Sequence, residues 1–138
     1  MENNKELLKR VQEGIDNQPF ARLLGLTPVS AEPGKVTISC KKREDLLQQV
    51  GYLHGGVIGA VAEAASGYAA LTLLEPGNSV LGVEYKVNFL RPAVGDEILA
   101  TATVLKNGRK LIVVDVDVTD PETHKAIAKM IVTAMPLN

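Results

Sequence analysis

The sequence predicts an α+β fold, in which a curved antiparallel sheet of five or six strands wraps around one long central helix, with a short additional helix at the N-terminus. Residues 53–74 consist almost entirely of apolar and small residues, as expected for a buried helix. Runs of alternating apolar and polar residues lie on both sides of this stretch, and turn sequences separate them. One sheet face must therefore be covered by the single long helix.

The central stretch begins with Leu53-His54-Gly55-Gly56 and ends before Glu75-Pro76-Gly77, where proline cannot continue a helix. Its positions are apolar or small on nearly every side, so we expect the helix to be buried all round. The exception is Glu63, at the middle of the stretch. A buried charge is costly unless it is paired, hydrogen-bonded or neutralised, and no cation on the same helix could pair with it. Glu63 therefore requires either a structural or a functional explanation.

The other elements follow from hydrophobic spacing. Residues 3–14 carry apolar residues at helical intervals among charges and predict an amphipathic helix that ends near Gly14. A helical turn is expected at residues 19–25, and residues 43–50 predict a loop with one possible helical turn. Alternation predicts strands at residues 26–31, 35–41, 83–89, 98–104, 112–119 and 126–134. We divide the chain into an N-terminal helix, residues 1–18, and one domain, residues 19–138.

Composition excludes several classes of function. The chain has 15 Lys and Arg against 16 Asp and Glu and no Trp, so neither a basic field nor stacking side chains indicate a nucleic-acid partner. Two histidines and a single cysteine, Cys40, predict no metal cluster, and Cys40 alternates as a small core residue. The polar N-terminus has no signal-peptide core, and residues 53–74 are too weakly hydrophobic for a membrane span. We expect a cytoplasmic protein without a membrane partner.

Two motifs together resemble a known family. Gly51-Tyr52-Leu53-His54-Gly55-Gly56 is followed by Glu63, nine residues after His54, and later by Val83-Glu84-Tyr85-Lys86-Val87-Asn88-Phe89-Leu90-Arg91-Pro92-Ala93. The pattern is similar to hot-dog acyl-CoA thioesterases of the PaaI-like and 4-hydroxybenzoyl-CoA thioesterase type, over about residues 19–135. The resemblance implies a hot-dog fold, a homodimer with active sites at the subunit interface, and assembly of such pairs into a homotetramer. The leftover sheet edges and apolar surface also favour a homodimer.

The residue chemistry fits thioester hydrolysis. Backbone N–H groups at a helix start are free and lie at the positive end of the helix dipole, and glycine lets a carbonyl approach them. By resemblance, the Gly55 amide polarises the thioester carbonyl, while Glu63 of the neighbouring subunit is either the nucleophile or the general base that activates water. The leaving thiol has a pKa of about 8.5 and needs little acid assistance.

Other site residues carry alternative interpretations. Gln48 occupies a position where the family orients the water or the thioester, although it could be an ordinary loop residue. His54 could transfer a proton, but a histidine at a helix entry usually fixes the turn. Gly67 and Gly82 depart from the family, which usually has Ser or Thr at these positions. These two glycines weaken the expected secondary polar contacts and leave the acid unaffected.

The resemblance also implies a substrate, an aryl or medium-chain acyl-CoA, and no cofactor apart from the coenzyme A of that substrate. We expect Gly56 and Tyr68 to contact it and Arg91, Arg109 and Lys110 to meet the coenzyme A phosphates, although each cation could be an ordinary surface charge. A hot-dog hydratase or dehydratase is the alternative enzyme, but it needs a catalytic histidine in a proline-rich approach to the helix, which is absent here. A non-catalytic acyl-CoA-binding protein is the alternative outside enzymes.

Overall fold

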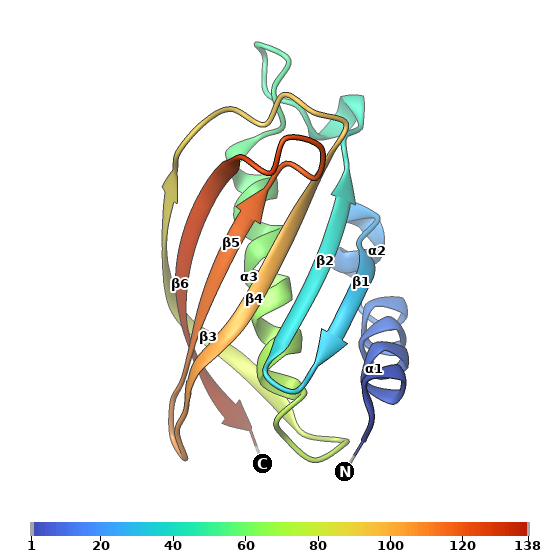
Figure 1. The fold of residues 1–138 in the computed structure, drawn as a ribbon, viewed down its shortest axis with the longest axis vertical. Helices are drawn as coiled ribbons and strands as arrows, with labels where there is room; N and C mark the ends of the chain where they lie inside the picture. The colour runs from blue at the N-terminus through green and yellow to red at the C-terminus, as the bar shows by residue number, and fades with distance from the viewer. Residues whose placement is uncertain (1, 138) are drawn as a thin grey trace.

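A computed structural model describes residues 2–137 and contains a six-stranded antiparallel sheet wrapped around one helix (Figure 1). The helices are α1 (Asn4–Asp16), α2 (Pro19–Leu24), the short 3₁₀ helix η1 (Glu44–Leu46) and the central α3 (Gly55–Leu71). The strands are β1 (Thr27–Glu32), β2 (Lys35–Lys41), β3 (Ser79–Phe89), β4 (Glu97–Asn107), β5 (Ile112–Thr119) and β6 (Ala126–Leu137). Their order in the sheet is β1-β2-β4-β5-β6-β3. The predicted fold class is confirmed, and the sheet has six strands, the larger of the two numbers predicted.

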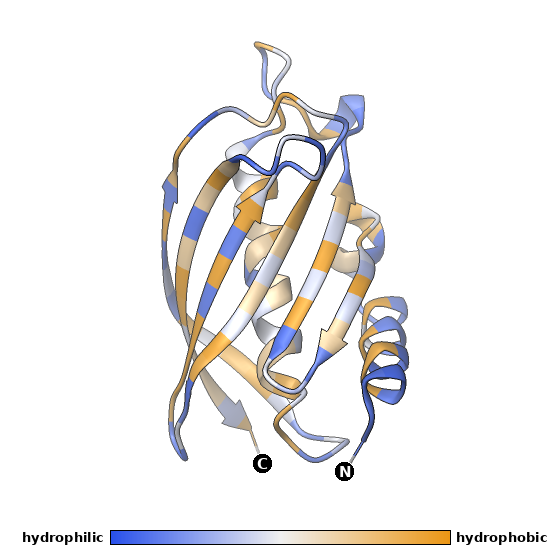
Figure 2. Cartoon of the chain, viewed as in Figure 1, coloured by the Kyte–Doolittle hydropathy of each residue, from blue (hydrophilic) through white to orange (hydrophobic). Residues whose placement is uncertain are grey.

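The alternation in sequence separates the two faces of the sheet, as the hydropathy colours of β2 and β5 show in Figure 2. On β5, Ile112, Val114, Val116 and Val118 are fully buried, while the residues between them face outward. The inward residues pack on the sheet-facing side of α3, where Val61, Ala62, Ala65 and Ala69 are fully buried. Cys40 lies in the same core, as expected, and burial raises the pKa of its thiol.

Helix α3 begins at the His-Gly-Gly sequence as predicted, but it ends at Leu71 rather than continuing to residue 74. Arg10 of α1 binds this end, because its guanidinium donates to the carbonyl oxygens of Leu71 (2.8 Å) and Leu74 (3.0 Å). A cation at a helix C-terminus also complements the helix dipole. In addition, the Thr72 hydroxyl donates to Ala69 O and accepts from the Gly34 N–H, which joins the end of α3 to the β1–β2 turn.

The expectation that the central helix is buried all round is wrong for the single chain. One side of α3, opposite the sheet, remains partly open, and its residues are small apart from the one acid: Gly56, Ala60, Glu63, Ala64 and Gly67. The sheet covers one side of a helix and α1 another, so a single copy does not provide enough chain to close the third. An exposed apolar surface of this kind is typical of a contact surface.

Helix α1 packs against β1 and the C-terminal half of α3. Asn3 and Glu6 form a capping box at its start, and Leu7, Val11 and Ile15 are buried. The helix continues two residues beyond Gly14, where we expected it to end. Gly14 has a packing role instead, because a Cβ there would lie 2.7 Å from the Tyr68 ring. No helix within residues 2–137 has the length and hydropathy needed to cross a membrane.

The two edges of the sheet differ. Edge strand β1 carries Pro28 and an irregularity in register between Pro28 and Ser30. At the other edge, β3 is exposed along most of its length, and Leu81, Val83, Tyr85 and Phe89 are each about half exposed. Val83 is the extra residue of a bulge between Gly82 and Glu84, which breaks the simple alternation predicted for residues 83–89. Strand β3 pairs with β6 on one side, and its other side is an apolar edge without a neighbouring strand within residues 2–137.

Candidate active site

Glu63 projects from the middle of α3 toward the β3 edge. Its Oε1 lies 3.3 Å from the position that a Cβ would take on Gly82. Neither carboxylate oxygen has a hydrogen-bond or ion-pair partner within residues 2–137, and the residue is half-buried. Burial raises the pKa of Glu63 above the ordinary value for glutamate, with no other cause contributing. The structure thus has an unpaired acid whose proton affinity is increased by desolvation.

Glu63 and Gly82 line two cavities, which meet at these two residues. The larger, about 550 Å³, lies between α3 and β3 and is also lined by Phe20, Ala60 and Tyr85, among others. The smaller, about 250 Å³, extends along α3 toward α1 and is lined at its far end by Tyr68 and Leu71. The carboxylate is therefore placed where a ligand can reach it from two directions.

The start of α3 leaves one backbone donor free. His54 is the N-cap, and its Nδ1 accepts from the Gly56 N–H at 2.8 Å. The N–H groups of Val57 and Ile58 donate to the His54 carbonyl oxygen. Within the described part of the chain, nothing accepts from the Gly55 N–H, which lies at the positive end of the helix dipole. The free donor is thus the Gly55 N–H, the group that the sequence analysis assigned to the thioester carbonyl. That role stays a prediction.

The same geometry assigns His54 a structural contact, since its ring nitrogen is used for capping. The Gly56 amide is already occupied, so it is not available to a substrate oxygen. Over Gly55 lies the ring of Phe89, whose Cζ would be 3.1 Å from a Cβ at that position. Phe89 is half exposed, so its ring lies at the surface next to the free N–H.

Comparison with known proteins identifies the family. Residues 50–127 match the sequence model of the thioesterase superfamily. The chain belongs to this superfamily. Acyl-coenzyme A thioesterase 13 of Homo sapiens is 38% identical over 112 residues, which are 80% of this chain and 79% of that protein.

Solved structures agree. A thioesterase family protein from Silicibacter pomeroyi superposes with a TM-score of 0.88 at 37% identity, covering 95% of this chain and 98% of that chain. The PaaI protein of E. coli, from the phenylacetic acid degradation operon, has the same fold, with a TM-score of 0.89 at 20% identity over 99% of this chain and 97% of its own. The expected hot-dog fold is confirmed, and the chain is a thioesterase.

Gln48 of the thioesterase is turned into its own loop. Its Oε1 accepts from the backbone N–H groups of Val50 (2.6 Å) and Tyr52 (3.2 Å). The loop closes next to the His54 turn, because Leu47 and Leu53 form a β-bridge and the His54 N–H donates to Leu46 O. Within residues 2–137 the Gln48 Nε2 has no partner, so this amide can still donate to a ligand at the start of α3.

Tyr68 lies at the junction of α1 and α3 and is 6% exposed. Its hydroxyl is buried without a hydrogen-bond partner in the described structure. Burial raises the pKa of this hydroxyl, and the charge of Glu63 raises it further. Tyr68 therefore lies near the acid and lines the smaller cavity, while its contact with a substrate stays a prediction.

The three predicted phosphate-binding cations do not gather in one place. Arg91 follows Phe89 by two residues, and Phe89 contacts Gly55, so Arg91 lies near the start of α3. Arg109 and Lys110 lie in the β4–β5 turn, at the opposite end of the sheet (Figure 1). Of these three cations, therefore, a single chain brings only Arg91 close to the Gly55 amide. No three metal-ligating side chains cluster within residues 2–137.

The structure adds Tyr85, which sequence reasoning placed only on a strand face. Its hydroxyl oxygen would lie 3.6 Å from a Cβ on Gly59, one helical turn before Glu63. Tyr85 lines the larger cavity together with Glu63. The available signals were the shared strand face of Tyr85 and Phe89 and the glycine four residues before the acid. Neither signal predicts that Tyr85 contacts Gly59, because this contact depends on how β3 crosses α3.

Proposed function

We propose that this thioesterase hydrolyses the thioester bond of an acyl-CoA, with an aryl or medium-chain acyl group, to the free acid and coenzyme A. The observation that carries the proposal is the pair of unused groups: the unpaired carboxylate of Glu63 in a cavity and the free N–H of Gly55 at a helix start. An oxyanion donor and a nucleophile or base are the two groups that thioester hydrolysis requires.

The two groups of one site come from two copies of the chain. Gly55 and Glu63 are eight residues apart on one helix, which corresponds to about 12 Å along its axis, too far to hold a single thioester group between them. The open side of α3 and the exposed β3 edge support a homodimer in which a second copy covers both. The family resemblance supports further association of two such pairs into a homotetramer.

In the proposed reaction, the thioester carbonyl oxygen accepts from the Gly55 N–H of one copy. Glu63 of the other copy either attacks the carbonyl carbon or removes a proton from the water that attacks it. The tetrahedral intermediate places negative charge on the oxygen held by Gly55, and the C–S bond then breaks. Water supplies the OH of the acid and the hydrogen of the coenzyme A thiol, so the reaction balances as a hydrolysis.

Substrate contacts follow from position. Gln48 Nε2 is proposed to orient the thioester at the start of α3, and Tyr68 is proposed to contact the acyl group in the smaller cavity. Arg91 is the cation best placed for a coenzyme A phosphate at that helix start. Arg109 and Lys110 can serve the same site only from another copy of the chain, because they lie at the other end of this one.

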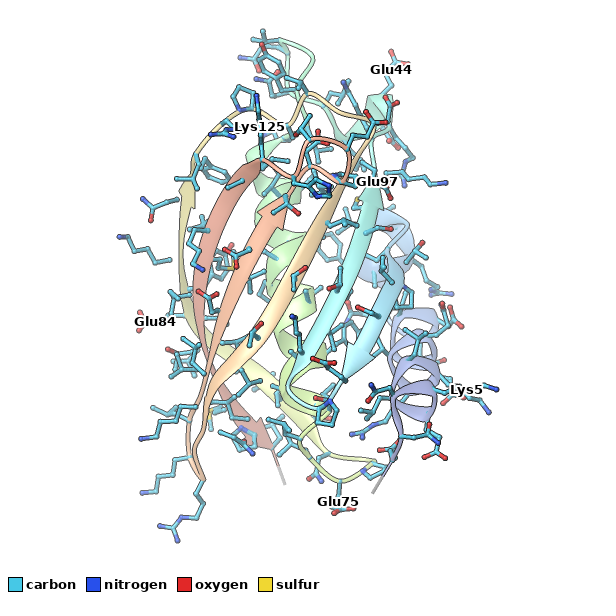
Figure 3. All side chains as sticks on the ribbon, viewed as in Figure 1. Lys5, Glu44, Glu75, Glu84, Glu97 and Lys125 are labelled. Atoms are coloured by element: carbon cyan, nitrogen blue, oxygen red, sulfur yellow. The ribbon has the colours of Figure 1, made fainter. Side chains whose placement is uncertain are left out.

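The test is a panel of aryl and medium-chain acyl-CoA substrates with detection of free thiol, run on the wild type and on Glu63→Ala. We expect Glu63→Ala to lose about a hundredfold or more in kcat while it keeps its circular dichroism spectrum. Glu75→Ala is the control, because Glu75 is an exposed acid beyond the end of α3 (Figure 3). Equal turnover of Glu63→Ala and wild type would remove the catalytic assignment.

Assembly is tested separately by light scattering on the wild type and on Leu81→Arg. Leu81 is half exposed on the β3 edge, where a like charge from each copy would repel the other. We expect the wild type to scatter as a multiple of its 14.7 kDa chain mass and Leu81→Arg to be monomeric and inactive. An active monomer would contradict the shared site.

A further inference from the structure

A hydroxyl group lies beside Glu63 in the groove between α3 and β3. The Tyr85 oxygen would be 3.6 Å from a Cβ on Gly59. On a helix, the Cβ positions of residues i and i+4 are about 5–6 Å apart, so this hydroxyl lies over the turn that precedes Glu63. Gly59 has no side chain to separate the two groups. Within residues 2–137 the Tyr85 hydroxyl and the Glu63 carboxylate make no direct hydrogen bond, but both line the same cavity, and a water molecule can bridge two polar groups in such an arrangement.

The composition of the larger cavity restricts which groups can hold that water. Its side chains are apolar or absent except for Glu63, Glu84 and Tyr85. Glu84 points outward from β3 in Figure 3, which leaves Glu63 and Tyr85 as the polar side chains that face inward. Neither the carboxylate nor the Tyr85 hydroxyl has a hydrogen-bond partner elsewhere in residues 2–137, and the cavity, about 550 Å³, exceeds the volume of a single water many times over.

We propose that Tyr85 is a positioning residue of the thioesterase, whose hydroxyl and the Glu63 carboxylate hold between them the water molecule that attacks the thioester. This inference rests on the proposed function and selects the general-base role for Glu63. The Tyr85 O–H donates to the water oxygen, the water donates one hydrogen to Glu63, and the remaining lone pair of the water is directed at the carbonyl carbon.

The proton balance of the step is simple. The bond between the water oxygen and the carbonyl carbon forms while Glu63 takes one proton from that water. The C–S bond then breaks, and Glu63 returns its proton to the departing sulfur, either directly or through solvent. Tyr85 keeps its own proton throughout, so it acts on the orientation of the water and on the charge of Glu63, not as an acid or a base.

The same arrangement determines how Glu63 titrates. The titratable side chains that line the two cavities beside it are Glu84, Tyr68 and Tyr85, and both cavities lack a cationic lining residue. A tyrosine that donates through water to the carboxylate favours its ionised form. Removal of that hydroxyl therefore raises the pKa of Glu63, whereas removal of a group with only a packing role leaves it unchanged.

The experiment compares the wild type with Tyr85→Phe, which keeps the ring over Gly59 and removes only the hydroxyl. We expect kcat to fall by about tenfold or more while KM changes little, and the acid limb of the kcat/KM profile to move to higher pH. A ¹³C NMR titration of the Glu63 carboxyl in the resting protein should move in the same direction. Lys86→Gln, on the opposite face of the same strand, is the control and should match the wild type in both readouts.

The NMR titration separates this inference from the proposed function, because it requires no turnover. A wild type that cleaves no acyl-CoA would overturn the proposed function, while the titration would still report whether Tyr85 acts on Glu63. If Tyr85→Phe leaves both kcat and the Glu63 titration unchanged, the positioning role is wrong. A loss of thermal stability without a change in either readout would also overturn it, since it would reduce Tyr85 to a packing residue.

Discussion

The carboxylate of Glu63 lies against bare backbone at Gly82, with its Oε1 3.3 Å from the place where a Cβ would stand. A side chain at that position would occupy the opening between the two cavities that meet at Glu63. The glycine on β3 therefore determines both where the acid rests and how a ligand reaches it. The backbone φ of Gly82 is not in the left-handed region, so larger residues are compatible with the strand.

The larger the side chain that replaces Gly82, the lower the activity should be. Gly82→Ala requires the carboxylate to shift by only a few tenths of an ångström and should keep most of the wild-type kcat. Gly82→Val should lower kcat by about tenfold or more, because it displaces Glu63 from its cavity, while the strand tolerates a β-branched residue. Steady-state kinetics with unfolding curves measure both effects. Equal kcat for the valine and alanine variants would contradict the steric explanation.

Substitution of Gly55 by proline removes the backbone N–H at this position. Gly55 is the first residue of α3, a position where proline is favoured, and the extended conformation of His54 is compatible with a following proline. Gly55→Pro should therefore fold normally and lose on the order of 10² to 10³ in kcat, because the oxyanion donor is gone. Gly55→Ala keeps the N–H and places a Cβ against Phe89, so it controls for steric effects. Similar kinetics for the proline and alanine variants would exclude the Gly55 amide as the donor.

Glu63 should lower stability at neutral pH. Its pKa is raised in the folded protein, so the folded state holds the proton more tightly than the unfolded state does. The free energy of unfolding should therefore fall as pH rises from about 4.3, the ordinary pKa of glutamate, through the raised value in the folded state.

Urea unfolding of Glu63→Gln over this pH range is the measurement. The variant should be more stable than the wild type at pH 7 and should lose this advantage below about pH 4, where the wild-type carboxyl becomes mostly protonated in both states. Glu75→Gln, at an exposed acid, should show no such dependence. A Glu63→Gln variant that is less stable at pH 7 would indicate a charge partner that stabilises the carboxylate.

Arg10 should contribute to stability without taking part in the chemistry. Its guanidinium donates to two carbonyl oxygens at the end of α3 and pairs with Glu2. Arg10→Met keeps the apolar stem and should lower the free energy of unfolding by about 2 kcal/mol, because hydrogen bonds from a charged donor are lost. Urea unfolding with Lys9→Met, an exposed neighbour, as control provides the measurement. Identical midpoints for the two variants would show that the contact contributes nothing.

The architecture was predictable because its signals are local. The alternation of β5, the apolar stretch and the His-Gly-Gly entry each occupy a few neighbouring residues, and they predicted the sheet, the central helix and its start correctly. Glu63 was conspicuous for the same reason, as a single acid in an otherwise apolar stretch. The free Gly55 amide follows from the helix start alone.

The surroundings of the acid were not predictable, because they depend on contacts between distant segments. The end of α3 is bound by Arg10, which lies 61 residues before Leu71 in the chain. Gly82 and Tyr85 face α3 together only because the bulge at Val83 shifts the register of β3 between them. Local alternation has no means of showing such a shift, and it also missed that β3 is an exposed edge.

The contrast between the two sheet edges limits how far copies of the chain can add to one another. Pro28 and the irregular register make β1 a poor template for a further strand, whereas β3 has exposed apolar side chains on both sides of its bulge at Val83. A sheet that can grow at only one end stops growing once that end meets its own equivalent. In the proposed homodimer both β3 edges are used, so the assembly cannot continue into open-ended fibres.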